Sequence, residues 1–169
     1  MDPIARWYVR TALLWMVAGF ILGSLLLLDA QLPGTWRRWG QPTHGHMLFV
    51  GWFFSFAVGV AYWLLPRQRT PRHPGGYDPR LAFIGWGSLN AGLVLRVICE
   101  PLQRSGYDGP LVITGLALAS VGHLVAAVIV ATQLWRRIIP KPQRAQSTTP
   151  AGRAKPDAGA SSPPGQSAV

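Results

Sequence analysis

The residues best suited to chemistry are histidines and one arginine that stand inside long apolar segments. His44 and His46 open the second of these segments, and His123 lies within the fourth. Arg96 precedes Glu100 by four residues near the end of the third. Neutral imidazole binds iron, copper and zinc. Because polar groups are costly in an apolar segment, each of these side chains is expected to bind a ligand or to contact a neighbouring helix.

The segments that carry these residues have the composition of membrane helices. Hydrophobic residues make up 49% of the 169-residue chain and charged residues only 13%. A helix needs about 20 apolar residues to cross a bilayer core, and four segments reach that length. We therefore expect an all-α fold, an integral membrane four-helix bundle within residues 1–139 that contacts the lipid bilayer. The expected helices span about residues 11–28, 44–65, 81–100 and 111–135.

The basic residues predict a topology. Most of them lie in three places: before the first segment, between the second and third, and after the fourth. Since basic residues favour the cytoplasmic side, we expect both termini in the cytoplasm and a multi-pass protein of the inner (cytoplasmic) membrane. The net charge of +10 then reflects topology, and no nucleic-acid partner is expected. Residues 140–169 are basic and rich in Pro, Ala, Ser and Gly, which predicts a disordered tail.

Small residues at four-residue spacing indicate which helix faces pack together. His123 continues one such stripe, so we expect it to point into the bundle. Extending the stripe of the second segment backwards reaches His44, which should also face inward, whereas His46 should point roughly the other way. The stripes are formed by Gly19 and Gly23, by Gly51, Ser55 and Gly59, by Ser88 and Gly92, and by Gly115 and Ala119.

Each candidate has an alternative interpretation. An inward His123 is either a heme-iron ligand or a hydrogen-bonding partner of a neighbouring helix. Arg96 either pairs with Glu100 or binds an anion, such as a heme propionate or a lipid phosphate. His44 and His46 form a His-x-His pair that can hold copper or zinc weakly. The hydrogen-bonding partners expected for His123 are Tyr62, Asn90 and Ser120.

The depths of the histidines limit the heme hypothesis. At a helical rise of about 1.5 Å per residue, His123 lies roughly 18 Å and His44 roughly 33 Å from the expected cytoplasmic boundary. This difference disfavours one heme shared by His44 and His123 in a single protomer. A heme held by one histidine, or at a dimer interface, remains open.

Two segments carry a family resemblance. Residues 43–67, THGHMLFVGWFFSFAVGVAYWLLPR, resemble the second transmembrane helix of heme–copper oxidase subunit I, especially in the cbb3-type and nitric oxide reductase branches. Residues 90–102, NAGLVLRVICEPL, resemble a helix of NnrS-type membrane proteins. The resemblance implies a heme b ligand at His44 or His46, and a role in electron transfer or as an accessory of a respiratory or nitric-oxide pathway. Other respiratory subunits or a second copy would be the partners.

The resemblance does not extend to a catalytic centre. A heme–copper centre with its low-spin heme needs more histidines than the four present, and His73 lies in a loop rich in Arg and Pro. We therefore expect no oxidase or reductase activity from this chain by itself. Heme b is the first candidate cofactor and copper the second. The alternative function is a non-enzymatic structural or metal-handling membrane protein that uses the His-x-His pair.

Overall fold

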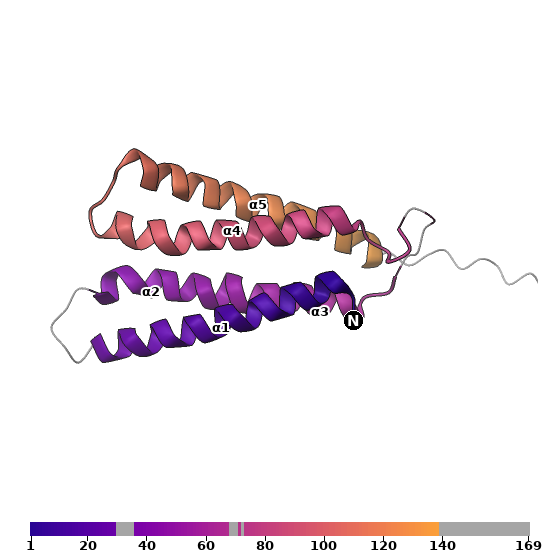
Figure 1. The fold of residues 1–169 in the computed structure, drawn as a ribbon, viewed down its shortest axis with the longest axis horizontal. Coiled ribbons are helices and arrows are strands. Elements are labelled where there is room, and N and C mark those ends of the chain that lie inside the picture. The colour runs from indigo at the N-terminus through magenta and orange to yellow at the C-terminus, as the bar shows by residue number, and fades with distance from the viewer. Residues whose placement is uncertain (30–35, 68–70, 72, 139–169) are drawn as a thin grey trace, which may run out of the picture.

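The computed structural model describes residues 1–29, 36–67, 71 and 73–138, and all regular structure in these ranges is helical (Figure 1). The α2, η1 and α3 segments follow one another without a break and form one long rod. The described chain is therefore a bundle of four rods, which confirms the predicted all-α fold. The elements are α1 (Pro3–Asp29), α2 (Trp36–His46), the π-helix η1 (Met47–Phe54), α3 (Ser55–Leu64), α4 (Pro79–Arg104) and α5 (Pro110–Ile138).

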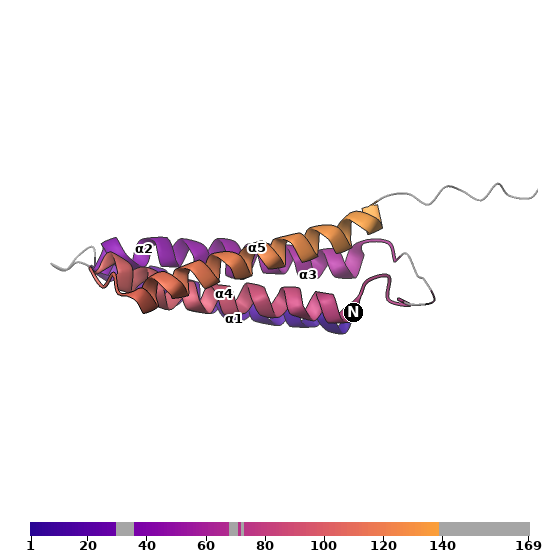
Figure 2. The ribbon, with the colours of Figure 1, turned by 90° about the horizontal axis from the view of Figure 1, so that it is seen from above.

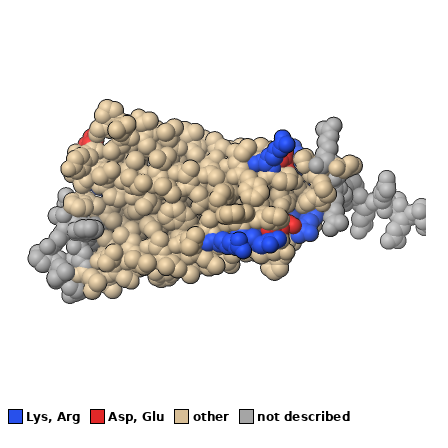
Figure 3. Space-filling model, viewed as in Figure 1, with Lys and Arg blue, Asp and Glu red and all other residues tan. Residues whose placement is uncertain are grey.

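All four rods are long and apolar enough to cross a membrane. Their outer faces carry large exposed apolar side chains, such as Leu14, Leu27 and Leu111, at 70%, 70% and 88% exposure. Figure 3 shows a surface almost free of charge along the middle of the bundle, with Lys and Arg gathered toward one end. Lipid, unlike water, solvates such a surface without cost. The chain is therefore a multi-pass membrane protein.

Several helix ends differ from the expected ones. The α1 helix begins at Pro3 because Ile4 and Tyr8 are buried in the core and their packing favours the helix. The second rod begins at Trp36, with Pro42 inside it. The α4 helix continues through Pro101 to Arg104 instead of ending at Glu100. A proline removes only its own donor, and within a membrane helix neighbouring groups can compensate for the loss.

Some predicted features lie in residues that the structure does not describe. The tail of residues 140–169 and the loop residues Arg69 and Arg72 lie outside the described residues. The N-terminus and the last turn of α5 lie at the same end of the bundle (Figures 1 and 2). We call this end the terminal end and the opposite one the loop end.

The small-residue stripes lie at helix contacts, as predicted. A Cβ atom built on Gly51 would meet the Trp15 side chain of α1. Between α4 and α5 the contact is with backbone, because a Cβ on Gly92 would lie 2.9 Å from the Ala119 carbonyl oxygen. A Cβ on Gly122 would lie 2.9 Å from the Ser88 carbonyl oxygen. These backbones therefore pack directly, as small residues allow in membrane helices.

One arginine links α5 to the end of α3 at the terminal end. Arg137 is 2% exposed, and its guanidinium donates three hydrogen bonds to backbone oxygens at and beyond the end of α3. The acceptors are Tyr62 at 3.1 Å, Leu65 at 2.8 Å and Pro66 at 3.3 Å. Carbonyls at a helix C-terminus have no intrahelical donor. Arg137 supplies it from α5, and we call this arrangement the Arg137 cap.

Candidate functional site

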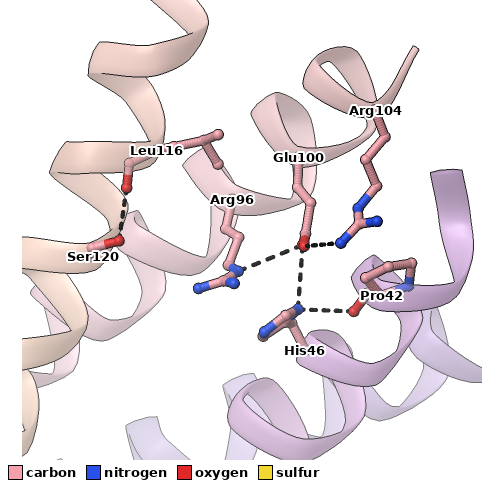
Figure 4. Close-up of polar contacts among 7 residues, drawn as sticks. All are labelled: Pro42, His46, Arg96, Glu100, Arg104, Leu116 and Ser120. Atoms are coloured by element: carbon pink, nitrogen blue, oxygen red, sulfur yellow. Dashed lines mark hydrogen bonds and ion pairs between the residues drawn. The ribbon is translucent and has the colours of Figure 1, made fainter. Parts of the chain in front are cut away.

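A cluster of charged side chains surrounds Glu100 near the loop end of α4 (Figure 4). The Glu100 residue is 6% exposed. Its carboxylate lies 3.5 Å from Arg96 Nε, 3.7 Å from Arg104 Nη2 and 3.2 Å from His46 Nδ1. The Arg96–Glu100 pair is one of the two interpretations that the four-residue spacing offered for Arg96. The contact of Arg104 with Glu100 was not predicted. Arg104 follows Glu100 by four residues, and this helical spacing would have predicted the contact.

The position of His46 fixes its tautomer. Its Nδ1 lies 2.8 Å from the Pro42 carbonyl oxygen and 3.2 Å from Glu100 Oε2 (Figure 4). A carbonyl oxygen only accepts hydrogen bonds, so Nδ1 must carry the proton. In the neutral ring Nε2 then keeps its lone pair. A histidine whose Nδ1–H is held by a carbonyl or carboxylate while Nε2 stays free is arranged as metal-ligating histidines are.

His44 faces a different helix. Its Nδ1 lies 2.9 Å from the Gly19 carbonyl oxygen of α1. A Cβ built on Gly23 would lie 2.6 Å from the His44 ring, so the ring packs against the glycine stripe of α1. His44 and His46 therefore face different neighbours, although His46, which was predicted to point roughly away from the side of His44, also contacts a helix of the bundle. The structure brings His46 to Glu100 and leaves His44 on α1.

His123 reaches the same region from α5. Its ring packs against Gly92, where a built Cβ would lie 3.4 Å from His123 Nε2. Gly92 stands four residues before Arg96 on α4, so His123 meets α4 about one helical turn from Arg96. His123 Nε2 is buried and has no hydrogen-bond partner among the described residues. The prediction that His123 points into the bundle agrees with this packing.

The partners expected for His123 are bonded elsewhere. Ser120 Oγ donates to the Leu116 carbonyl oxygen at 2.9 Å. Asn90 Oδ1 accepts from Trp15 Nε1 at 2.9 Å. The Tyr62 hydroxyl is itself buried without a partner. None of these three groups bonds His123 Nε2 among the described residues. Ser120 is engaged by a carbonyl of its own helix and Asn90 by a tryptophan of α1.

Two buried nitrogen atoms therefore remain unsatisfied in this part of the bundle. They are His123 Nε2 and Arg96 Nε, whose contact with Glu100 is an ion pair without hydrogen-bond geometry. Buried polar atoms are almost always hydrogen-bonded in folded proteins, so unpaired ones call for a ligand or water. Among the described residues no group of three or more His, Cys, Asp and Glu could hold a metal ion by itself. The site can thus offer one or two imidazoles and an arginine, but not a full set of metal ligands.

A π-helix begins directly after His46. The η1 segment runs over eight residues, Met47–Phe54, with Met47 and Gly51 buried. At its end Ser55 Oγ donates to the Val50 carbonyl oxygen at 3.2 Å. π-Helices are rare, and they occur frequently at functional sites. The apolar pattern of this segment gave no signal for it, since an all-apolar stretch suits either helix.

The comparison with known families agrees with this architecture. The family model described as "Cytochrome C and Quinol oxidase polypeptide I" matches residues 3–150, a range that includes all four rods. The chain belongs to this family. The resemblance to heme–copper oxidase subunit I is thereby confirmed over residues 3–150. No curated protein and no solved structure matches this member of the oxidase polypeptide I family significantly.

Proposed function

We propose that this chain binds heme b and serves in electron transfer, or as an accessory subunit, in a respiratory or nitric-oxide-related pathway. His46 and His123 are the candidate axial ligands, and Arg96 is the candidate partner of a propionate. The observation that carries the proposal is the buried, unpartnered Nε2 of His123, whose ring packs against Gly92 of α4, the helix that carries Arg96. Imidazole nitrogens are the usual protein ligands of b-type heme iron.

The geometry favours His46 over His44 as the partner of His123. His44 is bound to the Gly19 carbonyl of α1 and packs on Gly23, away from the Glu100 cluster. His46 is held through Nδ1 in the same way, but its ring lies against Glu100 of α4, the helix on which His123 also packs. By the same helical rise, His46 lies roughly 30 Å from the expected cytoplasmic boundary, which is about 3 Å nearer to the depth of His123 than His44 is.

The packing also limits where the macrocycle can lie. The α4 and α5 backbones touch at Gly92 and Gly122, so no planar group fits between them. A heme would have to lie on the side of α4 that faces α2, where the side chains of His46 and Arg96 approach each other (Figure 4). Of the residues present, His46 could ligate a heme placed there directly, and His123 could do so only if its ring turned away from Gly92.

In this proposal the residues of the chain have distinct roles. Heme, when bound, supplies a one-electron carrier. The Pro42 carbonyl accepts the hydrogen bond from His46 Nδ1, and the Glu100 carboxylate lies 3.2 Å from the same atom, which together orient Nε2 and raise its basicity. Arg96 and Arg104 offer positive charge to the propionates. The apolar faces of the helices keep water from the site.

The proposal does not include oxygen or nitric oxide reduction. The chain has four histidines, fewer than a heme–copper centre with its low-spin heme requires. His73 is remote from the site, because it lines a pocket with residues at the start of α4 and the end of α5. A role beside other respiratory subunits, or with a second copy of the chain, follows from the family and from the lack of a complete centre.

A reduced-minus-oxidised visible spectrum of the detergent-purified protein tests this function. After expression with added heme precursor we expect a Soret band and the α-band of a b-type heme. His123→Ala and His46→Ala should each remove or shift these bands. His73→Ala is the matched control, since it removes a histidine from the other end of the bundle. A wild-type protein with no Soret band would overturn the proposal.

A structural role is the second candidate, and contacts between helices favour it. His44 bonds to Gly19 of α1, and Asn90 links α4 to Trp15 of α1. Such bonds lock helices together without a cofactor. The metal-handling version would need His44 and His46 to share an ion, whereas their Nδ1 atoms contact different helices. If the wild type binds copper or zinc and the His44→Ala/His46→Ala double variant does not, the metal-handling function is supported.

We also propose that the terminal end faces the cytoplasm and that the protein lies in the inner membrane. The basic residues at this end support the orientation, since cytoplasmic loops are enriched in Lys and Arg. A C-terminal fusion to green fluorescent protein should fluoresce, and a C-terminal alkaline phosphatase fusion should be inactive. An active phosphatase would reverse the assignment.

A further inference from the structure

A second polar site lies at the terminal end, far from the Glu100 cluster along α4. A cavity of about 230 Å³ is bounded there by the start of α4, the loop before it and the last turns of α5. The α5 helix runs obliquely to α4 (Figure 2). The side chains used in the argument below are Tyr77, Asp78, Leu81, Gln133 and Arg136.

Gln133 is the feature of this cavity that needs an explanation. It is 8% exposed, and both its Oε1 and its Nε2 are buried without a hydrogen-bond partner among the described residues. A glutamine amide offers one acceptor and two donors, and leaving them unpaired inside a protein is costly. Because Gln133 lines the cavity, a ligand held there is the natural partner for its amide.

The charges around the cavity are of both signs. Asp78 caps α4 with one carboxylate oxygen, Oδ1, which accepts from the backbone N–H groups of Arg80 and Leu81 at 2.9 and 3.3 Å. Its other oxygen remains available. Arg136 is exposed and makes no ion pair within the described part of the chain. One anionic and one cationic group, with an amide that can both donate and accept, suit a zwitterion better than a simple anion.

The position of the cavity indicates where such a ligand would come from. Two membrane-spanning helices begin and end here, at Pro79 and Ile138. Trp135 and Leu81 are 68% and 45% exposed, as expected of residues at the boundary between lipid and water. Burial raises the pKa of the Tyr77 hydroxyl, so it stays neutral and can donate a hydrogen bond.

We propose that this cavity binds the phosphate–ammonium headgroup of a zwitterionic phospholipid, with Arg136 on the phosphate and with Asp78 and the Gln133 amide on the ammonium. A phosphoethanolamine headgroup has N–H donors for both oxygen acceptors. A phosphocholine headgroup has none, because its nitrogen is fully methylated. The site is independent of the proposed heme site, so either proposal can fail without the other.

Native mass spectrometry of the full chain in detergent tests the site. The protein is titrated with short-chain phosphatidylethanolamine, phosphatidylcholine and phosphatidylglycerol, and with free O-phosphoethanolamine. We expect phosphatidylethanolamine to bind about tenfold more tightly than the other two lipids. Gln133→Met and Arg136→Gln should each reduce that binding by about tenfold, as the loss of one hydrogen-bonding or charged group would.

Arg80→Gln is the matched control, because it removes a positive charge at the same end of the bundle from a residue outside the cavity lining. Its binding should equal that of the wild type, and circular dichroism checks that each variant is folded. Equal binding of all three lipids would overturn the proposal, because a cavity filled only with water gives no headgroup preference. Unchanged binding in both pocket variants would overturn it too. Binding of free O-phosphoethanolamine as tight as that of the lipid would reject the membrane as the source and assign the same chemistry to a soluble ligand.

Discussion

Two arginines in this bundle, Arg137 and Arg96, meet their surroundings in opposite ways. Arg137 at the terminal end is 2% exposed, and all three of its nitrogen atoms donate to carbonyl oxygens. Arg96 toward the loop end is 30% exposed in its side chain and has a buried Nε without a hydrogen bond. Every nitrogen atom of the first has an acceptor in the fold. The second has donor capacity that the fold does not use.

The difference separates a residue that holds the fold together from one that is available to a ligand. A buried guanidinium is tolerable only when hydrogen bonds compensate for its lost hydration, and Arg137 meets that condition. Arg96 lies beside a buried carboxylate that also contacts Arg104 and His46, so two arginines share one acidic partner. The excess positive charge there favours an anionic ligand.

The largest effect on stability should come from Arg137→Ala. It removes three hydrogen bonds and leaves the carbonyls of Tyr62, Leu65 and Pro66 without their donor. We expect the free energy of unfolding to fall by about 3 kcal/mol, measured by denaturant titration in mixed micelles. Arg137→Lys should recover only part of it, because an ammonium cannot reach all three oxygens. If Arg96→Ala costs as much as Arg137→Ala, the contrast between the two arginines is wrong.

The next largest effect should come from Gly92→Val. A Cβ at Gly92 would lie 2.9 Å from the Ala119 carbonyl oxygen, so the variant must push α5 away from α4 and move His123. We expect a loss of about 2 kcal/mol in the free energy of unfolding and weaker heme absorbance. The control is Gly87→Ala on the same helix, where no atom lies within 4 Å of the added methyl group. A comparable loss in Gly87→Ala would show that helix flexibility, and not packing, is responsible.

Glu100→Gln should have a smaller effect on stability. It removes the charge that three basic groups contact, but Arg96 and Arg104 are 30% and 45% exposed and can turn toward solvent or headgroups. We expect about 1 kcal/mol. Heme absorbance should be affected more, since His46 loses an anchor of its Nδ1. A large loss of stability with an unchanged spectrum would make the Glu100 cluster a structural feature like the Arg137 cap.

The smallest effect should come from Asp2→Asn. Asp2 Oδ1 lies 3.1 Å from Arg67 Nη2 at the terminal end, with side-chain exposures of 18% and 34%. Ion pairs of this kind contribute about 0.5 kcal/mol and are weakened by salt. The difference from the wild type should therefore shrink when unfolding is measured at high salt. Asp108→Asn, in the exposed turn before α5, is the control and should show no difference at either salt concentration.

The sequence predicted the four spans because about 20 apolar residues in a row have few alternatives to a membrane helix. It also placed the glycine stripes and the Arg96–Glu100 pair, since these depend on helical spacing alone. It did not predict which helix each histidine faces. That depends on the arrangement of the helices, as His44 on α1 and His46 on α4 show. The Arg137 cap and the Gln133 cavity depend on contacts between residues more than 50 positions apart, which no local pattern encodes.

The π-helix η1 determines how far the two halves of the second rod are rotated relative to each other about the rod axis. His46 before it faces α4, and Gly59 after it packs against Ala5 and Tyr8 of α1. The wider turn of η1 changes the rotation between these two faces relative to a plain α-helix. Deleting one residue within 47–54 would convert the segment to α-helical winding and turn one half of the rod against the other. In such a shortened chain either His46 would still contact Glu100 or Gly59 would still pack against α1, but the two contacts could not form together.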